Sequence, residues 1–446
     1  DYCYLVVNGE RRALSPEFDE IDSPNQEIKF CATQVIDDLS SMFDTCKNLL
    51  SINIEKWDTS EVNNMSYMFN NCYSLTSIEE LSKLKTSKVE AMSNMFNNCS
   101  SLKSLKGVET WDMSNVLDIS NMFFGCTSIE SLEPLENWDV SNVTDANNLF
   151  HGCSLIKTLK GLSKWNVQNL TNMSSMFEEC TNLVSLDGVE NWNTLKVKNM
   201  TCIFSGCTNL SSIAELENWN VSSNNNLNSS FSNCNSLKSL KGLEKWDVSN
   251  CYDMSHLFSE CSSLESIKSL ENWNTQNVMT IDYLLHGCKS LITLEGIEHW
   301  KITNITDISC IFNNCSKLVS IKALEKWDTI SVTKMDYLCN SCSCLVSIEG
   351  VENWNTSQVE DMSYAFNGCS SLSSISQLKN WNTSSVSDMS QMFNGCISLL
   401  CTQGLENWDT SKVTEMYYMF GDCQMLFFVQ ELEKWNTSNV NNMSSM

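Results

Sequence analysis

Proline is nearly absent from this 446-residue chain: only 3 occur, and all lie in its first third, at Pro16, Pro24 and Pro134. A boundary between compact domains is usually marked by a Pro- or Gly-rich linker. The sequence has no such linker after Pro134. The length alone would suit two or three globular domains, but the missing linkers argue against that division.

Basic residues are also scarce, with 28 Lys and Arg against 54 Asp and Glu, and the net charge is −26. Binding to nucleic acid or to anionic lipid requires a basic patch, so neither is expected. The acidic surface indicates either a solvated exterior or a cationic partner. No apolar run approaches the roughly 20 residues of a membrane helix, so membrane insertion is not expected.

Catalytic motifs are missing as well. There is no nucleophile elbow, P-loop or dinucleotide-binding glycine fingerprint. The 4 histidines lie in different sequence contexts and are interpreted as occupying unrelated positions: His151, His256, His286 and His299. The sequence therefore predicts no enzyme, no metal and no cofactor.

What the chain does contain is one 27-residue unit repeated about fifteen times. Tryptophan, phenylalanine and cysteine each recur with this period in nearly every unit. Representative members are Trp111, Trp138 and Trp165, then Phe123, Phe150 and Phe177, then Cys126, Cys153 and Cys180. A unit of this length cannot bury its own apolar side, so neighbouring units must stack on each other.

The apolar spacing within a unit predicts the local structure. Met389, Met392, Phe393 and Cys396 stand at i, i+3, i+4 and i+7, the pattern of one face of a short helix. We therefore expect an α/β repeat solenoid, a right-handed leucine-rich-repeat-like coil. Short parallel strands would lie on one side and short helical turns on the other. At about 4.8 Å per coil, the array would be a rod of about 70 Å.

The two ends of the chain differ from the repeat. Residues 1–36 lack it, carry the extra cysteines Cys3 and Cys31, and are expected to cap the core. A Cys3–Cys31 disulfide would staple that cap. Residues 37–446 form the solenoid, which stops in mid-repeat and is expected to be truncated or uncapped. Because the chain starts at Asp1 without Met, we expect a mature or trimmed segment.

The repeat motif W-[DN]-x-S-x-V-x-x-M-S-x-M-F-x-x-C-x-x-L resembles that of the BspA-like leucine-rich-repeat surface proteins. Residues 141–145 and 249–255 carry it, and the likeness extends from Asp37 to Met446. The resemblance implies a cell-surface or secreted location and a role in adhesion or binding. The period here is 27 rather than 26, and no lipobox cysteine precedes the repeats.

The regular side chains allow a structural and a functional interpretation. The cysteine ladder is expected to consist of buried thiols rather than metal ligands, because zinc sites use close pairs. Disulfides between adjacent coils remain open. The tryptophan ladder is expected in the core, although a sugar-stacking stripe is the alternative. The recurring Glu two residues before Trp is interpreted as a solvated row, with calcium bridging as the alternative.

Two further expectations concern polar residues. Glycosylation sequons include Asn142, Asn220, Asn304, Asn355, Asn382 and Asn436, which makes a glycoprotein plausible in a eukaryotic secretory pathway. Polar residues fill core positions between Asn224 and Ser230, so a loose coil or bend is expected there.

The function expected from these features is that of an extracellular structural or adhesive protein. It would bind a protein or glycan partner, or associate head to tail into a fibre. The alternative is an intracellular scaffold that binds proteins on the concave solenoid face.

Overall fold

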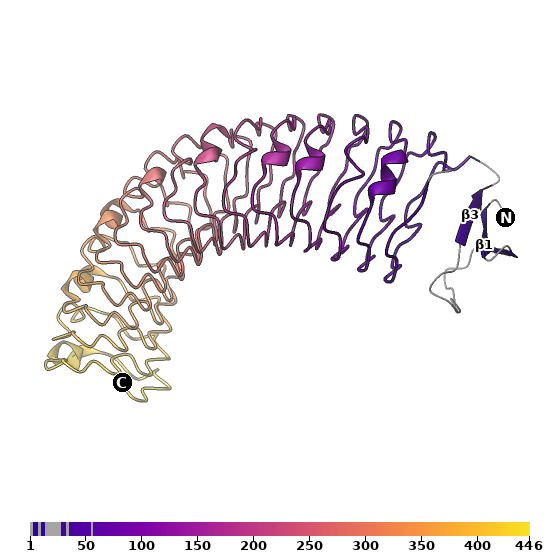
Figure 1. Ribbon diagram of the computed structural model, residues 1–446. Helices are drawn as coiled ribbons and strands as arrows, with labels where there is room; N and C mark the ends of the chain where they lie inside the picture. The colour runs from indigo at the N-terminus through magenta and orange to yellow at the C-terminus, as the bar shows by residue number, and fades with distance from the viewer. Residues whose placement is uncertain (1–2, 8–9, 14–27, 33–34, 55–56) are drawn as a thin grey trace.

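The computed structural model describes the backbone of residues 3–7, 10–13, 28–32, 35–54 and 57–446, with side chains from residue 35 onward in these ranges. The repeats stack into a solenoid, as the sequence predicts, but the array bends into an arch rather than a straight rod (Figure 1). The N-terminal strands lie beyond the first coil, and the last coil ends the arch.

Three strands precede the repeats: β1 (Cys3–Val7), β2 (Glu10–Ala13) and β3 (Ile28–Ala32). They form an antiparallel sheet in the order β2-β1-β3. Cys3 is opposite Ala32, and Cys31 is opposite Tyr4. The side chains of both cysteines lie outside the described residues, so their disulfide stays a prediction. The capping role of residues 1–36 likewise stays a prediction.

Coil-to-coil hydrogen bonds follow one segment of each coil. A single parallel bridge, such as Asp118↔Asp145, opens the segment. Every second N–H then donates to the next coil, from Ile119 to the Asp145 oxygen at 3.1 Å and from Phe123 to the Leu149 oxygen at 3.0 Å. The expected parallel strands are thus reduced, within the described solenoid, to isolated bridges that continue as a hydrogen-bond ladder.

The helix predicted over residues 389–396 is wrong. The Met392 N–H donates to the Met389 oxygen, and the Cys396 N–H to the Phe393 oxygen, so the segment consists of overlapping turns. Gln391 has a left-handed φ of 56° and donates its N–H to Tyr417 of the next coil. Because every second N–H from Met389 to Gly395 binds the neighbouring coil, these groups are not available for the i→i−4 bonds of an α-helix.

The helical elements lie on the other side of the coil and are 3-10 helices; no α-helix occurs among the described residues. In chain order they are η1 (Glu79–Lys83), η2 (Glu133–Leu135), η3 (Lys160–Leu162), η4 (Ala214–Asn218), η5 (Lys268–Leu270), η6 (Lys322–Lys326), η7 (Ser376–Asn380) and η8 (Gln430–Lys434). From η3 to η8 each helix starts 54 residues after the one before it, twice the 27-residue period.

Glycine turns occupy the coils between these helices. Gly242 has a φ of 111°, and a Cβ there would lie 2.3 Å from the Ile213 carbonyl oxygen, just before η4. Its N–H donates to Glu244 at 2.7 Å. The same bond recurs at Gly107, Gly188, Gly296, Gly350 and Gly404. From η3 onward the structural unit is therefore a pair of coils, and part of the glutamate row closes turns rather than only facing solvent.

The core consists of the recurring apolar side chains. Phe123 is fully buried and Trp138 is 2% exposed. The Cys153 thiol donates to the Phe123 oxygen at 3.2 Å. The thiol and indole ladders thus add hydrogen bonds between coils to the apolar burial, and they leave few polar groups unsatisfied in the core.

Ring spacing explains the arch. Successive Phe rings are 5.4–5.9 Å apart. Successive Trp rings are 5.9–6.4 Å apart. Coils that are farther apart at Trp than at Phe must fan out, so the Trp side lies nearer the outer rim.

The loose coil expected between Asn224 and Ser230 is not found. The Ser230 hydroxyl is fully buried and hydrogen-bonds the Met200 and Leu227 oxygens at 2.9 and 2.8 Å. The Phe204 N–H donates to the Ser230 oxygen at 3.0 Å, so the ladder continues unbroken. Local hydroxyl pairing satisfies the polar side chain at this core position, while the Asn224 Nδ2 has no hydrogen-bond partner.

Candidate interaction surface

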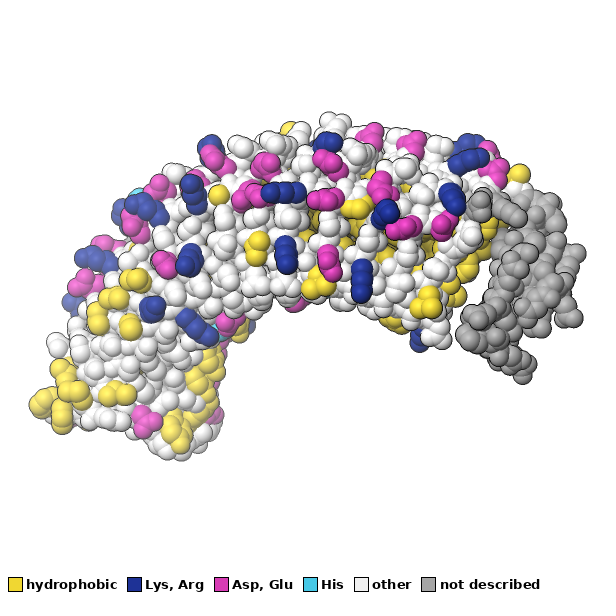
Figure 2. Space-filling model, viewed as in Figure 1, with side chains coloured by type: hydrophobic (Ala, Val, Ile, Leu, Met, Phe, Trp, Pro, Cys, Tyr) yellow, Lys and Arg dark blue, Asp and Glu magenta, His cyan; other side chains and the backbone are white. Residues whose placement is uncertain are grey.

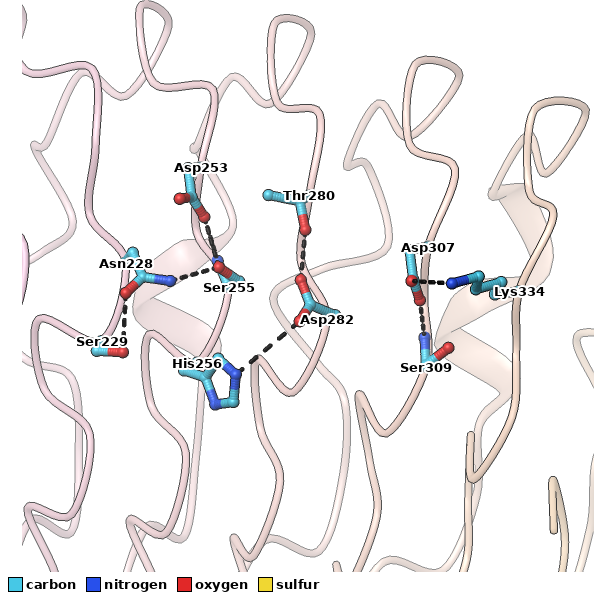
Figure 3. A network of polar contacts seen from close by, with 10 residues as sticks. All are labelled: Asn228, Ser229, Asp253, Ser255, His256, Thr280, Asp282, Asp307, Ser309 and Lys334. Carbon is cyan, nitrogen blue, oxygen red and sulfur yellow. Dashed lines mark hydrogen bonds and ion pairs between the residues drawn. The ribbon is translucent and has the colours of Figure 1, made fainter. Parts of the chain in front are cut away.

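We call the ladder face the outward side chains at positions 64, 66, 67, 70 and 71, and at the equivalent positions every 27 residues. Between them, Met65, Met68 and Phe69 turn inward and are fully buried. Figure 3 looks onto this face, with the 3-10 helices behind it. Side chains of the same position in successive coils therefore form rows across the face.

Side chains in the row at position 64 accept hydrogen bonds from the backbone N–H two residues later. The Asp253 Oδ1 accepts the Ser255 N–H at 3.0 Å, and the Asp307 Oδ1 accepts the Ser309 N–H at 2.9 Å (Figure 3). The Asp307 Oδ2 also lies 4.0 Å from the Lys334 Nζ. This row mixes Asn and Asp because either side chain makes the turn, so the carboxylates are not required by the fold.

Three of the four histidines lie on the ladder face, whereas His299 directly precedes Trp300. His151 and His286 occupy the same position five repeats apart, so the interpretation of unrelated positions is wrong. The His286 Nε2 lies 3.2 Å from the Glu260 Oε1, and the His256 Nε2 lies 3.9 Å from the Asp282 Oδ2. Burial lowers the pKa of His286, although Glu260 opposes that shift.

Aromatic rings form the most distinctive row. His256, Tyr283, Cys310, Tyr337 and Tyr364 follow one another at position 67, each with a left-handed φ between 53° and 58°. His256 stacks on Tyr283 with ring centroids 4.5 Å apart, and Tyr337 stacks on Tyr364 at 4.3 Å. These two stacked pairs leave the Cys310 coil between Tyr283 and Tyr337.

Carboxylates lie near the Cys310 coil, between the two stacked pairs. The Ser309 hydroxyl donates to the Asp336 Oδ1 at 2.5 Å. Burial raises the pKa of Asp336, and the nearby charges of Asp361 and Asp307 contribute to that rise. Hydrogen bonding with Cys310 raises the pKa of Tyr283 to about 12. Negative charge is thus concentrated around the Cys310 coil, beside the phenol rings of Tyr283 and Tyr337.

The N-terminal half of the ladder face is different. After Tyr67, the equivalent position holds Asn94, Asn121, Asn148, Ser175, Cys202 and Ser229. All have the same left-handed backbone as the aromatic row. The rings are therefore not required by the backbone. Aligning the sequence by its 27-residue period, position by position, would have revealed the row.

The cysteine ladder consists of free thiols within the described chain. Burial raises the pKa of Cys126 to about 12 and that of Cys310 to about 11. Thiols held in the protonated form are poor nucleophiles. Among the described residues, no group of three or more His, Cys, Asp or Glu is arranged to hold a metal ion.

The sequon asparagines fall into two structural groups. The Nδ2 atoms of Asn142 and Asn304 donate to the preceding coil at 2.7 and 2.9 Å, and Asn169 does the same at 2.7 Å. In the second group, Oδ1 accepts the N–H two residues later, and all its side chains are exposed: Asn220, Asn355, Asn382 and Asn436. Glycosylation of either group stays a prediction.

Within the described residues, no helix has the length and apolarity needed to cross a bilayer. The ladder face instead offers partly exposed carboxylates, amides and aromatic rings on a regular scaffold. Such a surface suits the binding of a partner through hydrogen bonds and charge.

One family model matches the repeats along the chain. The family model described as "Mycoplasma protein of unknown function, DUF285" matches seven overlapping segments: 12–131, 103–188, 124–241, 182–295, 225–347, 289–374 and 340–446. No curated protein matches significantly.

Solved structures with similarity are leucine-rich-repeat proteins. A leucine-rich cell surface protein from Faecalibacterium prausnitzii is 17% identical, with a TM-score of 0.42, and the match covers 97% of this chain and 99% of that one. A leucine-rich repeat protein from Bacteroides ovatus is 15% identical, with a TM-score of 0.31 and coverage of 86% and 76%. One from Eubacterium ventriosum is 16% identical, with a TM-score of 0.34 and coverage of 73% and 84%.

Proposed function

The chain belongs to the family described as "Mycoplasma protein of unknown function, DUF285", and we propose that it is a non-catalytic adhesive protein displayed at the cell surface or secreted. Its ladder face would bind a protein or glycan partner. The resemblance of its repeat motif to the BspA-like surface proteins supports the location, and the net charge of −26 suits an exposed surface.

One observation carries this proposal: the coils share their core but differ on the ladder face. Every coil from Cys72 to Cys396 buries its ladder cysteine completely, whereas position 67 varies along the chain, with Asn, Ser or Cys from Asn94 to Ser229 and mainly Tyr or His from His256 to Tyr364. Since either set fits the same backbone, the change supports a role in recognition rather than in folding.

A fibre is the second form of this proposal. Figure 2 shows apolar side chains exposed at the end of the arch that carries the last coil. Phe427 is 71% exposed and Phe428 is 59% exposed, at positions where an earlier coil has Ser373 and Ser374. Exposed rings of this kind support end-to-end contact between molecules. The intracellular scaffold stays the alternative.

Adhesion is tested with the native protein on intact cells. Brief protease treatment of intact cells should remove the protein, and beads coated with the purified chain should adhere to partner cells or matrix. Protein found only inside the cell would contradict the surface role. Bare beads and beads coated with heat-denatured chain are the controls for adhesion.

Electron microscopy of the purified chain tests the fibre. End-to-end filaments that disperse in the variant Phe427→Ser with Phe428→Ser would support it. Uniform single arches at all concentrations would remove the fibre form while leaving adhesion intact.

A further inference from the structure

We propose that two copies of this chain pair side by side through one flank of the solenoid. This pairing goes beyond the proposed adhesive role, which does not require it. We call the flank the side chains at positions 73 to 77 in five successive coils: residues 289–293, 316–320, 343–347, 370–374 and 397–401.

A row of exposed apolar side chains follows position 76 along the flank. Ile292, Val319 and Val346 lie in three adjacent coils and are 49%, 39% and 52% exposed, and Leu400, two coils further on, is 43% exposed. The Val346 N–H donates to the Val319 oxygen, and the Val319 N–H to the Ile292 oxygen, both at 3.2 Å, so backbone bonds hold the row in register. Figure 2 shows apolar side chains on the flank of the arch toward its C-terminal end. Each of these coils has a neighbour on both sides, so the exposure is not that of an open end.

The fold does not require apolar residues in this row. Position 76 holds Lys103, Glu130 and Lys157 in three successive coils of the N-terminal half. Lys238 and Glu265 hold it in the two coils before Ile292. Charged side chains therefore fit the same backbone, and the exposed apolar stretch indicates a contact outside the chain.

Charge favours a second copy as the occupant of the flank. The net charge of the chain is −26, so two copies repel each other wherever their carboxylates meet. The flank contains no Asp or Glu, and its charged residues are Lys289 and Lys317. Just beyond it, Glu295 lies 2.7 Å from the Lys268 Nζ. Two of these acidic chains can therefore approach each other closely along the flank.

The apolar row is self-complementary about its middle coil. A two-fold axis that runs across the coil of Val346 places this residue opposite its equivalent in the other copy. The same axis places Ile292 opposite Leu400 and Val319 opposite Ser373. Apolar side chains thus face each other at the centre and at both ends of the flank.

The lysines fit the same axis. Lys289 faces Ile397 of the other copy, and Lys317 faces Ser371, so no lysine faces another lysine. The methylene groups of Lys289 can cover the isoleucine while the ammonium group stays in water. The axis reverses the direction of stacking and keeps the inner rim beside the inner rim, so the two arches curve together.

The size of the flank predicts the strength of the pairing. Five coils about 4.8 Å apart span roughly 20 Å. This is smaller than a standard interface, which buries about 800 Å² per partner, so the dimer should form reversibly and depend on concentration. An isologous contact is complete with two copies, whereas the end-to-end contact of a fibre adds further copies.

Sedimentation velocity of the full chain over a range of concentrations tests the pairing. The same measurement on Phe427→Ser with Phe428→Ser removes the contribution of the fibre contact. In both we expect a monomer–dimer equilibrium that shifts toward the dimer as salt screens the repulsion between acidic chains. Monomers at every concentration, or growth beyond the dimer in the double variant, would overturn the proposal.

A substitution at the axis tests the flank itself. Val346→Glu places two carboxylates opposite each other and should weaken the dimer about tenfold or more. The variant should fold, because Glu130 and Glu265 occupy the same position in other coils. Val184→Glu is the matched control: Val184 lies in the same row, is 47% exposed and lies outside the flank, so the dimer should be unchanged. Equal weakening in the two variants would assign the effect to added charge alone and overturn the proposal.

Cys344 supplies a readout of where the copies meet. This exposed cysteine lies at position 74 of the middle coil, so the axis brings it opposite its equivalent in the other copy. A short bis-maleimide should link the two thiols into a covalent dimer, which should be lost in Cys344→Ala and reduced in Val346→Glu. A dimer that is cross-linked equally well in Cys344→Ala would place the contact elsewhere and overturn the proposal.

Discussion

The indole Nε1–H of Trp138 donates to the carbonyl oxygen of Val108, in the coil before it, at 2.8 Å. The same bond occurs from Trp111 to the Leu81 oxygen and from Trp219 to the Val189 oxygen, at 2.9 and 2.8 Å. Tryptophan thus contributes a buried ring and also a hydrogen bond that ties adjacent coils together. The tie accounts for Trp in place of another large apolar residue, since Phe, Leu and Met carry no hydrogen-bond donor.

Replacing Trp138 with Phe tests that tie. The variant keeps most of the apolar burial but removes one of the two donors to the buried Val108 oxygen, which keeps only the Trp111 N–H. We therefore expect a loss of about 1 kcal/mol in the free energy of unfolding. Urea denaturation followed by circular dichroism measures it. Trp435→Phe is the control, because its bond to the Leu405 oxygen is only partly buried and its loss should cost less. Equal losses in the two variants would contradict the argument.

Replacing Gly242 with Ala tests the alternation of coils. The new Cβ would lie 2.3 Å from the Ile213 oxygen at a φ of 111°, so the helical coil before it must shift. We expect a loss of about 3 kcal/mol or more. In the control, Gly152→Ala, the nearest atom is 3.6 Å away and φ is 74°, so the loss should be near 1 kcal/mol. Thermal melts of the two variants decide between these outcomes.

The core and the stacked architecture could be predicted from the sequence because they depend on period alone. Trp, Phe and Cys recur every 27 residues, and stacking follows from that recurrence. The helix over residues 389–396 could not be excluded in this way. Its apolar spacing fits a helix, but its N–H groups donate to the next coil, and side-chain periodicity does not report where backbone donors go.

The candidate surface was missed for a different reason. His256, Tyr283 and Asp336 are far apart in the sequence and come together only when positions are aligned across coils. The two-coil unit left a visible signal in the 54-residue spacing of Gly188 and Gly242. What this glycine does depends on the approach of the preceding carbonyl, which only the structure shows.

Replacing Asn224 with Val should stabilise the chain. The Asn224 side chain is 1% exposed, its Nδ2 has no partner, and Val197 fills the same position in the previous coil. Removing an unsatisfied buried amide should raise the free energy of unfolding by about 1 kcal/mol, even though the bond from the Asn226 N–H to the Asn224 Oδ1 is lost. Urea melts measure the gain. Ser230→Met provides the contrast, because the Ser230 hydroxyl is satisfied by two carbonyl oxygens and its removal should bring no such gain.

The thiol ladder should make the fold sensitive to alkaline pH. Burial raises the pKa of Cys126 and of Cys261 to about 12 in the folded chain, against 9.0 for an unperturbed thiol. Above pH 9 the unfolded chain loses thiol protons that the folded chain retains, so stability falls as pH rises from about 9 to 12 and is fully present below 9. Each such thiol should lower the free energy of unfolding by about 1.4 kcal/mol at pH 10 relative to pH 8.

Cys126→Ala should therefore be less stable than the parent chain at pH 8. Between pH 8 and pH 10, however, its free energy of unfolding should fall by roughly 1.4 kcal/mol less than that of the parent chain, in urea titrations at the two pH values. Cys344→Ala, at an exposed cysteine, is the control for the loss of a thiol outside the core. A pH dependence unaltered in both variants would show that the ladder thiols do not set the alkaline limit.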